Sequence, residues 1–144
     1  MLNISKRLVF IINVPAFFLS HRLPIAVAAK SKGWHVELIT GQSSSAKMEA
    51  DSAGSLSQAG IAHYSAPFKA TGTNPLTEAF GLWHVLRQVR KTKPDVIHTA
   101  SPKGNLYGGI AARLCGAPKL VIAVSGQGYL FTGNAGPVKR GIGA

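Results

Sequence analysis

Polar side chains that could contact a ligand follow apolar runs at several places in the chain. The first run, Arg7 to Ile12, is continuous and rich in aliphatic residues, as in a strand buried on both faces of a parallel sheet. The polar residues after it are Asn13, Ser20 and His21. Ligands of βαβ folds bind beyond the carboxyl ends of the strands. We therefore expect function first in the segment 13–21.

A second polar group follows the apolar run at residues 95–99, which predicts a strand with His98 near its carboxyl end. Ser101 then precedes a proline at the predicted start of a helix, and Lys103 and Asn105 follow in its first turns. Backbone N–H groups in a first turn lack intrahelical partners, so a lysine there completes the outline of an anion site. A phosphate or carboxylate would suit it. A solvated lysine beside a capping serine explains the same residues equally well.

A third group, Ser125, Gly126 and Gly128, follows the predicted fifth strand. Its glycines would allow the backbone to approach a ligand closely or to turn tightly. The chain has no Gly-x-Gly-x-x-Gly after its first strand and no Gly-Lys-Ser or Gly-Lys-Thr phosphate loop. Dinucleotide-binding and P-loop functions are therefore disfavoured.

The residues leave the roles of two histidines open. His98 could act as a base, as a hydrogen-bond partner of a ligand, or as a satisfied core histidine. His21 could point into the predicted crevice or simply be exposed. We expect no carboxylate at the strand ends, because the acidic residues fall within predicted strands and helices. We therefore predict no carboxylate pair and no metal site, and we assign no catalytic residue.

Strand and helix patterns alternate along the chain. The predicted strands are 7–12, 34–40, 61–65, 95–99 and 119–124, and the predicted helices are 20–32 with Ser20 as its N-cap, 46–59, 74–91 and 103–114. Such βα units predict an α/β fold, a Rossmann-like doubly wound parallel sheet in the order 3-2-1-4-5 with helices on both faces. Residues 1–132 would form this domain, and 133–144 a linker or a truncated end.

The charge of the chain is strongly basic. It has 16 lysines and arginines, 5 acidic residues and a net charge of +11. Four cations, Arg87, Arg90, Lys91 and Lys93, lie at the far end of the predicted helix 74–91. They could complement the helix dipole, or they could face an anionic membrane surface. Aromatic residues are sparse in the basic stretches, so we expect no nucleic-acid partner. A single cysteine excludes an intrachain disulfide and fits a reducing compartment.

Four motifs in this order resemble the N-terminal domain of bacterial family 4 glycosyltransferases. They are FFLSHRLP at 17–24, PDVIHT at 94–99, SPKGNLYGGIAARL at 101–114 and VSGQGYLF at 124–131. The resemblance implies the N-terminal half of a GT-B enzyme. In that fold two Rossmann-like domains face each other, and the enzyme retains the anomeric configuration of the transferred hexose without a metal or cofactor.

In that family the N-terminal domain binds the acceptor and often touches a membrane, while the C-terminal domain binds most of the nucleotide-sugar. The resemblance therefore implies a polyprenyl-linked saccharide acceptor, lipopolysaccharide or other polysaccharide biosynthesis, and a cytoplasmic location peripheral to the inner membrane. The chain alone, without a donor domain, would be inactive.

The chain departs from the family at two positions. The first loop reads Asn13-Val14-Pro15-Ala16 where many members carry a Gly-Gly pair, and Ser125 stands where many place a histidine. The alternative from the residues alone is a stand-alone Rossmann-like binding or regulatory module, whose basic face docks on nucleic acid or a protein partner.

Overall fold

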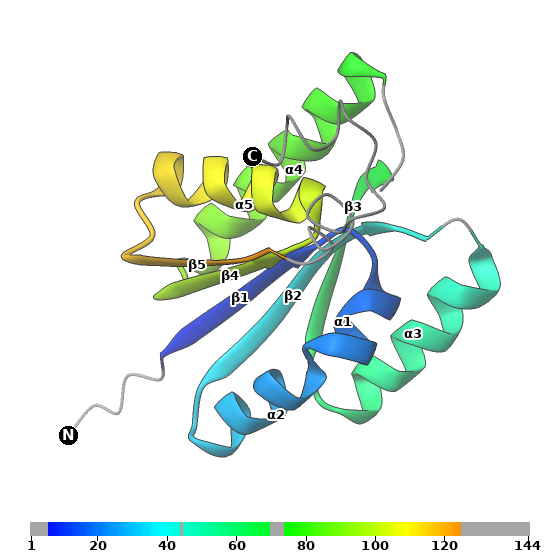
Figure 1. Cartoon of the computed structure of the whole chain (residues 1–144), viewed down its shortest axis with the longest axis vertical. Helices are drawn as coiled ribbons and strands as arrows, with labels where there is room; N and C mark the ends of the chain where they lie inside the picture. Colours follow the sequence, from blue (N-terminus) through cyan, green and yellow to red (C-terminus); the bar gives the residue numbers. More distant parts are fainter. Residues whose placement is uncertain (1–5, 44, 70–73, 125–144) are drawn as a thin grey trace, which may run out of the picture.

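A computed structural model describes residues 6–43, 45–69 and 74–124. Its core is one five-stranded parallel sheet in the order β3-β2-β1-β4-β5. The strands are β1 (Arg7–Ile12), β2 (His35–Gln42), β3 (Ala62–Lys69), β4 (Val96–Ala100) and β5 (Lys119–Ala123). The predicted fold class, strand number and strand order are confirmed (Figure 1). The predicted domain boundary at residue 132 lies outside the described residues.

Helices cover both faces of the sheet. They are α1 (Pro15–His21), α2 (Leu23–Ser31), α3 (Ala46–Gln58), α4 (Pro75–Thr92) and α5 (Pro102–Cys115). Figure 1 shows α4 and α5 together on one face and α1, α2 and α3 on the other. The alternation of right-handed βα units about a central β1 produces this arrangement.

The predicted helix 20–32 with Ser20 as its N-cap is wrong. A separate helix, α1, already begins at Pro15, whose fixed φ suits a first helical position. Ser20 lies inside α1, and its hydroxyl donates to the backbone oxygen of Ala16 over 3.0 Å. The break between α1 and α2 falls at Arg22, because Pro24 has no N–H to continue the ladder.

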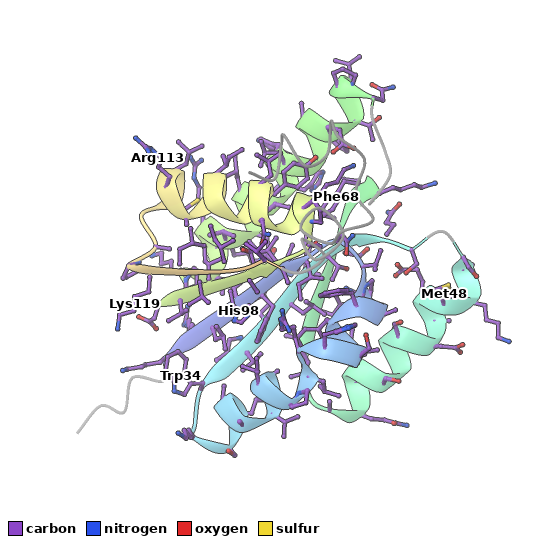
Figure 2. The ribbon with its side chains drawn as sticks, viewed as in Figure 1. Trp34, Met48, Phe68, His98, Arg113 and Lys119 are labelled. Carbon is purple, nitrogen blue, oxygen red and sulfur yellow. The ribbon has the colours of Figure 1, made fainter. Side chains whose placement is uncertain are left out.

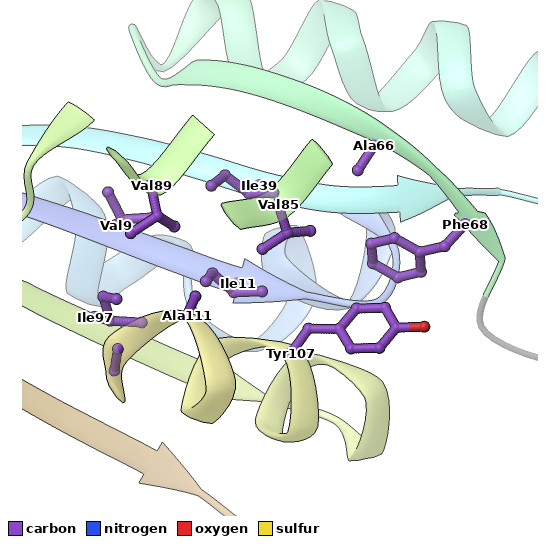
Figure 3. Close-up of a cluster of buried hydrophobic side chains, with 11 residues drawn as sticks. Val9, Ile11, Ile39, Ala66, Phe68, Val85, Val89, Ile97, Tyr107 and Ala111 are labelled. Carbon is purple, nitrogen blue, oxygen red and sulfur yellow. The ribbon is translucent and has the colours of Figure 1, made fainter. Parts of the chain in front are cut away.

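The alternating strand residues build two apolar cores, one on each face of the sheet. Val9 and Ile11 of β1 face α4 and α5, whereas Leu8 and Phe10 face α1 and α2. Figure 3 shows the first core, in which the rings of Phe68 and Tyr107 meet edge to face with centroids 5.0 Å apart. This contact brings the end of β3 to the first turns of α5.

Two glycines allow α5 to lie directly on β1 and β4. A Cβ at Gly104 would lie 2.5 Å from the backbone oxygen of Ile11, and one at Gly108 would overlap the Cγ2 methyl of Thr99. Both neighbours belong to central strands and cannot move aside cheaply. The start of α5 is therefore held close to the carboxyl end of β1.

The variant Gly108→Ala should destabilise the domain by about 1–3 kcal/mol, because overpacking against Thr99 outweighs the better helix propensity of alanine. Gly109→Ala is the matched control, since a Cβ there meets nothing within 4 Å. It should be neutral or stabilising by up to about 1 kcal/mol. Urea unfolding of both variants measures the difference, and equal midpoints would contradict the packing described here.

Candidate functional site

The first and fourth strand ends meet, as the sequence predicted. β1 pairs with β4 in parallel, with Phe10 opposite His98. Just beyond the strands, the backbone N–H of Asn13 donates to the hydroxyl of Ser101 over 3.0 Å. The backbone oxygen of Asn13 accepts from Gly41 N, also at 3.0 Å, so the loop after β1 is tied on both sides. Asn13 and Ser101 therefore form one junction at the carboxyl edge of the sheet.

Ser101 occupies the N-cap position of α5 but does not cap the helix with its side chain. Its hydroxyl is committed to Asn13, and its backbone has φ 73° and ψ 154°. Non-glycine residues rarely adopt this region, and holding one there costs about 1–3 kcal/mol. The hydrogen bond between Ser101 and Asn13 and the close packing of Gly104 maintain this backbone conformation of Ser101. Backbone strain of this kind clusters at functional sites.

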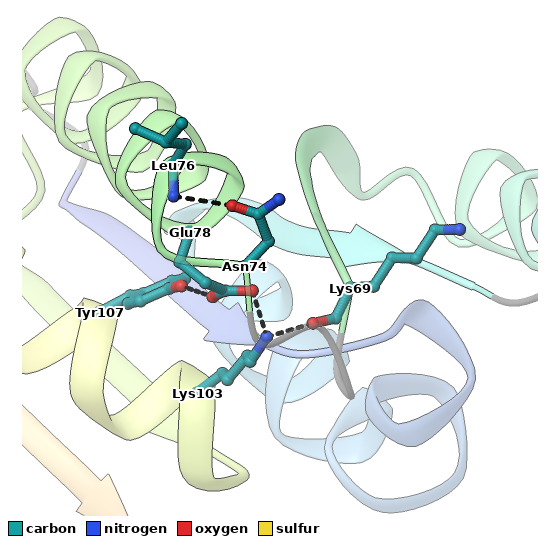
Figure 4. A network of polar contacts seen from close by, with 6 residues as sticks. All are labelled: Lys69, Asn74, Leu76, Glu78, Lys103 and Tyr107. Atoms are coloured by element: carbon teal, nitrogen blue, oxygen red, sulfur yellow. Dashed lines mark hydrogen bonds and ion pairs between the residues drawn. The ribbon is translucent and has the colours of Figure 1, made fainter.

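Lys103 takes part in a polar network between α5, α4 and β3 (Figure 4). Its ammonium group forms an ion pair with Glu78 at 2.6 Å and donates to the backbone oxygen of Lys69. The hydroxyl of Tyr107 donates to the other oxygen of Glu78. The expectation that no carboxylate reaches the strand ends is therefore wrong. Glu78 was missed because α4 approaches from a distant part of the chain, and sequence spacing does not show that approach.

The network also sets the ionisation of its members. Burial by itself raises the pKa of the Glu78 carboxyl, but hydrogen bonds from Lys103 and Tyr107 and the lysine charge outweigh it and hold the pKa below its usual value. Burial, and then the hydrogen bond and charge of Glu78, raise the pKa of the Tyr107 hydroxyl. At neutral pH the network is an ammonium, a carboxylate and a protonated phenol. The Lys103 charge is thus already compensated.

His98 lies on the other face of the sheet, in the core beneath α1. Its ring packs on Phe10 with centroids 4.9 Å apart, and Phe10 in turn meets Phe18 of α1 at 5.1 Å. Burial, and then the nearby charge of Arg22, lower the pKa of its imidazole. His98 is therefore neutral at pH 7. Arg22, at the break between α1 and α2, was not among the predicted site residues.

The remaining predicted residues differ in their surroundings. Ser20 and His21 are exposed, with the Ser20 hydroxyl 2.7 Å from His21 Nδ1 and the imidazole stacked on Phe17. Asn105 accepts a hydrogen bond from Thr99 and donates one to the backbone oxygen of Ala123, so it joins β4, α5 and β5. Ser125, Gly126 and Gly128 lie outside the described residues.

Two further observations describe the space around these side chains. A cavity of about 150 Å³ adjoins the Glu78 network; its lining residues are Gln42, Pro67, Phe68, Lys69, Asn74, Thr77 and Glu78. Within the described residues, no three histidine, cysteine or acidic side chains gather closely enough to hold a metal ion.

Replacing Glu78 should destabilise the domain. Glu78→Gln removes the carboxylate that pairs with Lys103, with an expected loss of about 1 kcal/mol at pH 7. The folded pKa of Glu78 is depressed, so its stabilisation is present above the unfolded pKa and is lost as the pH falls through the folded one. The difference between wild type and variant should therefore shrink below about pH 4.

Urea unfolding at pH 7 and at pH 3 measures this difference. Asp51→Asn, at an exposed carboxylate of α3, is the control. A difference between wild type and Glu78→Gln that stays constant with pH would contradict the assigned ion pair.

Comparisons with known proteins support a glycosyltransferase fold. The chain resembles MurG from Acinetobacter baumannii (TM-score 0.65, 17% identity). The match covers 83% of this chain and 35% of MurG. It also resembles a glycosyltransferase from Rickettsia africae (TM-score 0.59, 14% identity), covering 83% and 30%. The zinc-inhibited teicoplanin deacetylase Orf2 is similar too (TM-score 0.58, 13% identity), covering 91% and 72%. These likenesses concern the fold, and the fold by itself does not decide the activity.

The chain spans about a third of the length of the first two structures. No curated protein matches its sequence. The assignment to a family rests on the sequence. A family model described as a glycosyl transferase 4-like domain matches residues 21–142. That match covers most of the chain, including α1's last residue and every later described element. The chain belongs to the glycosyl transferase 4-like family, as an N-terminal domain of the GT-B type.

Proposed function

We propose that this chain is the acceptor-binding half of a glycosyltransferase that transfers a hexose from a nucleotide-sugar to a lipid-linked saccharide in cell-surface polysaccharide biosynthesis. The family match over residues 21–142 is the observation that carries the proposal. A second Rossmann-like domain, not contained in this chain, binds most of the donor. The enzyme retains the anomeric configuration and uses neither a metal nor a cofactor.

The geometry supports the carboxyl edge of the sheet as the acceptor side. The strained junction of Asn13 and Ser101 lies there, with Lys103 on the side of α4. His98, on the α1 face, pairs with Phe10 two residues before the end of β1, and His21 is the last residue of α1. Hydroxyl-rich saccharides are bound through such neutral donors and acceptors, whose geometry selects among hydroxyl positions. Lys103 shares its charge with Glu78, so its interaction with an acceptor diphosphate would require that pair to rearrange.

The activity is tested with the full-length protein, a panel of nucleotide-sugars and a polyprenyl diphosphate-linked saccharide. Transfer with retention, followed by NMR of the anomeric proton, is the expected result, and the 144-residue chain alone should be inactive. His21→Ala should lower kcat/KM about tenfold, since losing one hydrogen bond to the substrate costs about 1–1.5 kcal/mol.

His35→Ala is the matched control for that variant, because His35 is an exposed histidine at the opposite, amino end of β2. It should leave kcat/KM unchanged. A full-length reading frame without a second domain, or no transfer from any nucleotide-sugar, would favour the alternative of a binding module.

The outer face of α4 supports the proposal that the enzyme acts at a membrane surface. Leu76, Phe80 and Trp83 are 82%, 54% and 51% exposed and recur at helical spacing on one side of the helix. Arg87 continues the same side, with its guanidinium carbon 5.4 Å from the centre of the Trp83 ring. Apolar and aromatic side chains beside cations suit the interface of an anionic bilayer. No helix among the described residues is long and apolar enough to cross a membrane.

We propose that the enzyme is attached peripherally to the inner membrane at its cytoplasmic face, as the resemblance to family 4 glycosyltransferases implies. The chain should sediment with vesicles containing phosphatidylglycerol and much less with pure phosphatidylcholine, and salt should weaken the binding. Replacing both Phe80 and Trp83 by serine should reduce binding at least fivefold. Val27→Ser, at a half-exposed valine on α2, should not. Equal recovery with both lipids at low salt would remove the membrane assignment.

A further inference from the structure

The cavity of about 150 Å³ lies at the carboxyl edge of the sheet, between the ends of β2 and β3 and the first turn of α4. Gln42, the last residue of β2, and Phe68 of β3 both line it. Gly41, the residue before Gln42, donates its N–H to the backbone oxygen of Asn13 over 3.0 Å. Figure 2 labels Phe68 at the end of the sheet where the first turn of α5 lies. The cavity therefore lies at the same edge as the junction that Asn13 forms with α5.

The size and charge of the cavity favour one neutral ring as its ligand. Pockets for drug-sized ligands measure about 300–1,000 Å³, whereas a cavity of about 150 Å³ accommodates a single six-membered ring. The Glu78 carboxylate in its wall is paired with Lys103, and Figure 4 shows the Lys69 ammonium group directed away from that pair. An anionic group of the ligand would lie beside Glu78 and be repelled by it.

Glu78 keeps acceptor capacity for two more donors. Its Oε1 accepts from the Lys103 ammonium group at 2.6 Å, and its Oε2 accepts from the Tyr107 hydroxyl. An ionised carboxylate offers about four acceptor positions, so each oxygen can still accept one hydrogen bond. The Glu78 side chain is 21% exposed, and Lys103 and Tyr107 fix its orientation from α5. Two hydroxyl groups on adjacent ring carbons can therefore donate to the two oxygens together.

Two neutral side chains of the cavity wall complement the carboxylate. The Asn74 side-chain oxygen accepts from the backbone N–H of Leu76 over 3.0 Å and so caps α4. Within residues 6–43, 45–69 and 74–124, neither the Asn74 amide nitrogen nor the Thr77 hydroxyl has a hydrogen-bond partner. An amide donor and a hydroxyl beside a carboxylate match a sugar ring, because each sugar hydroxyl both donates and accepts.

We propose that this cavity binds one neutral sugar ring of the acceptor, with two adjacent ring hydroxyls donating to the two oxygens of Glu78. The Asn74 amide donates to a further oxygen of the same ring. The inference rests on the proposed function in taking the acceptor saccharide as the ligand. It adds the position of one sugar, and it makes Glu78 a specificity-determining residue that selects a vicinal diol.

The test is an NMR titration of the ¹⁵N-labelled 144-residue chain with methyl glucoside, inorganic phosphate, and the 1,2- and 1,4-isomers of trans-cyclohexanediol. The glucoside should shift the backbone amide resonances of Asn74, Thr77 and Glu78 saturably. The two diols differ only in the spacing of their hydroxyls. The 1,2-isomer should bind about fivefold more tightly than the 1,4-isomer, because only its hydroxyls can reach both oxygens of Glu78.

Two wall variants, each with a matched control, assign the binding. Glu78→Gln should weaken glucoside binding about tenfold, because an amide accepts at only one of its two atoms. Asp51→Asn, at an exposed carboxylate of α3, should leave it unchanged. Asn74→Asp keeps the oxygen that caps α4 but removes the amide donor, so it should weaken binding about fivefold without lowering the urea midpoint. Gln58→Glu makes the same change at an exposed position of α3 and is its control.

Equal binding of the two diols, tighter binding of phosphate than of the glucoside, or unchanged glucoside binding in both Glu78→Gln and Asn74→Asp would overturn the proposal. The titration needs no donor domain and no turnover. Sugar transfer by the full-length protein without glucoside binding to this chain would therefore overturn this inference alone. Glucoside binding without transfer from any nucleotide-sugar would overturn the proposed function alone.

Discussion

The parallel pairing of β1 with β4, with α5 seated directly on both, is the constraint on which the rest of the structure depends. Because the strand order places these two strands side by side at the centre, their following segments leave from one edge. Gly104 brings the first turn of α5 against the backbone of Ile11. The hydrogen bond from Asn13 to Ser101 then joins the two departing segments. Asn13 and Ser101, and with α5 also Lys103 and Asn105, take their positions from this junction.

The junction divides the site electrostatically. On the α4 side, Lys103 and Glu78 compensate each other and Tyr107 completes their hydrogen bonding. On the α1 side, the Arg22 guanidinium carbon lies 6.0 Å from the centre of the Phe17 ring, and burial lowers the pKa of the His98 imidazole. A partly buried ion pair with satisfied partners holds elements together. The Lys103–Glu78 pair therefore fixes α4 to α5.

Much of the fold could be predicted from the sequence because its βα periodicity is strong. The apolar strands, their order and the helix covering 74–91 follow from composition and spacing alone. The division into α1 and α2 was missed because Pro15 and Pro24 both act as first-turn residues, and the run between them contains an apparent N-cap, Ser20. Pro15, Ser20 and Pro24 each favour a helix start in this run. The packing of Phe18 into the core favours the helix that begins at Pro15.

The site was predicted less completely than the fold. Polar residues after strands β1 and β4 were identified because the topology determines where strand ends lie. Glu78 was missed because its approach to Lys103 depends on how α4 packs beside α5, and no spacing in the sequence encodes a distance between two helices. A contact between distant elements thus accounts for the omission.

We propose that saccharide transfer takes place at the shared carboxyl edge of β1 and β4. A crystal structure of the full-length protein with a bound nucleotide-sugar would test this placement. The sugar ring of the donor should face the junction of Asn13 and Ser101 across the gap between the two domains. A donor sugar that faces the amino ends of the strands, or the outer face of α4, would contradict it.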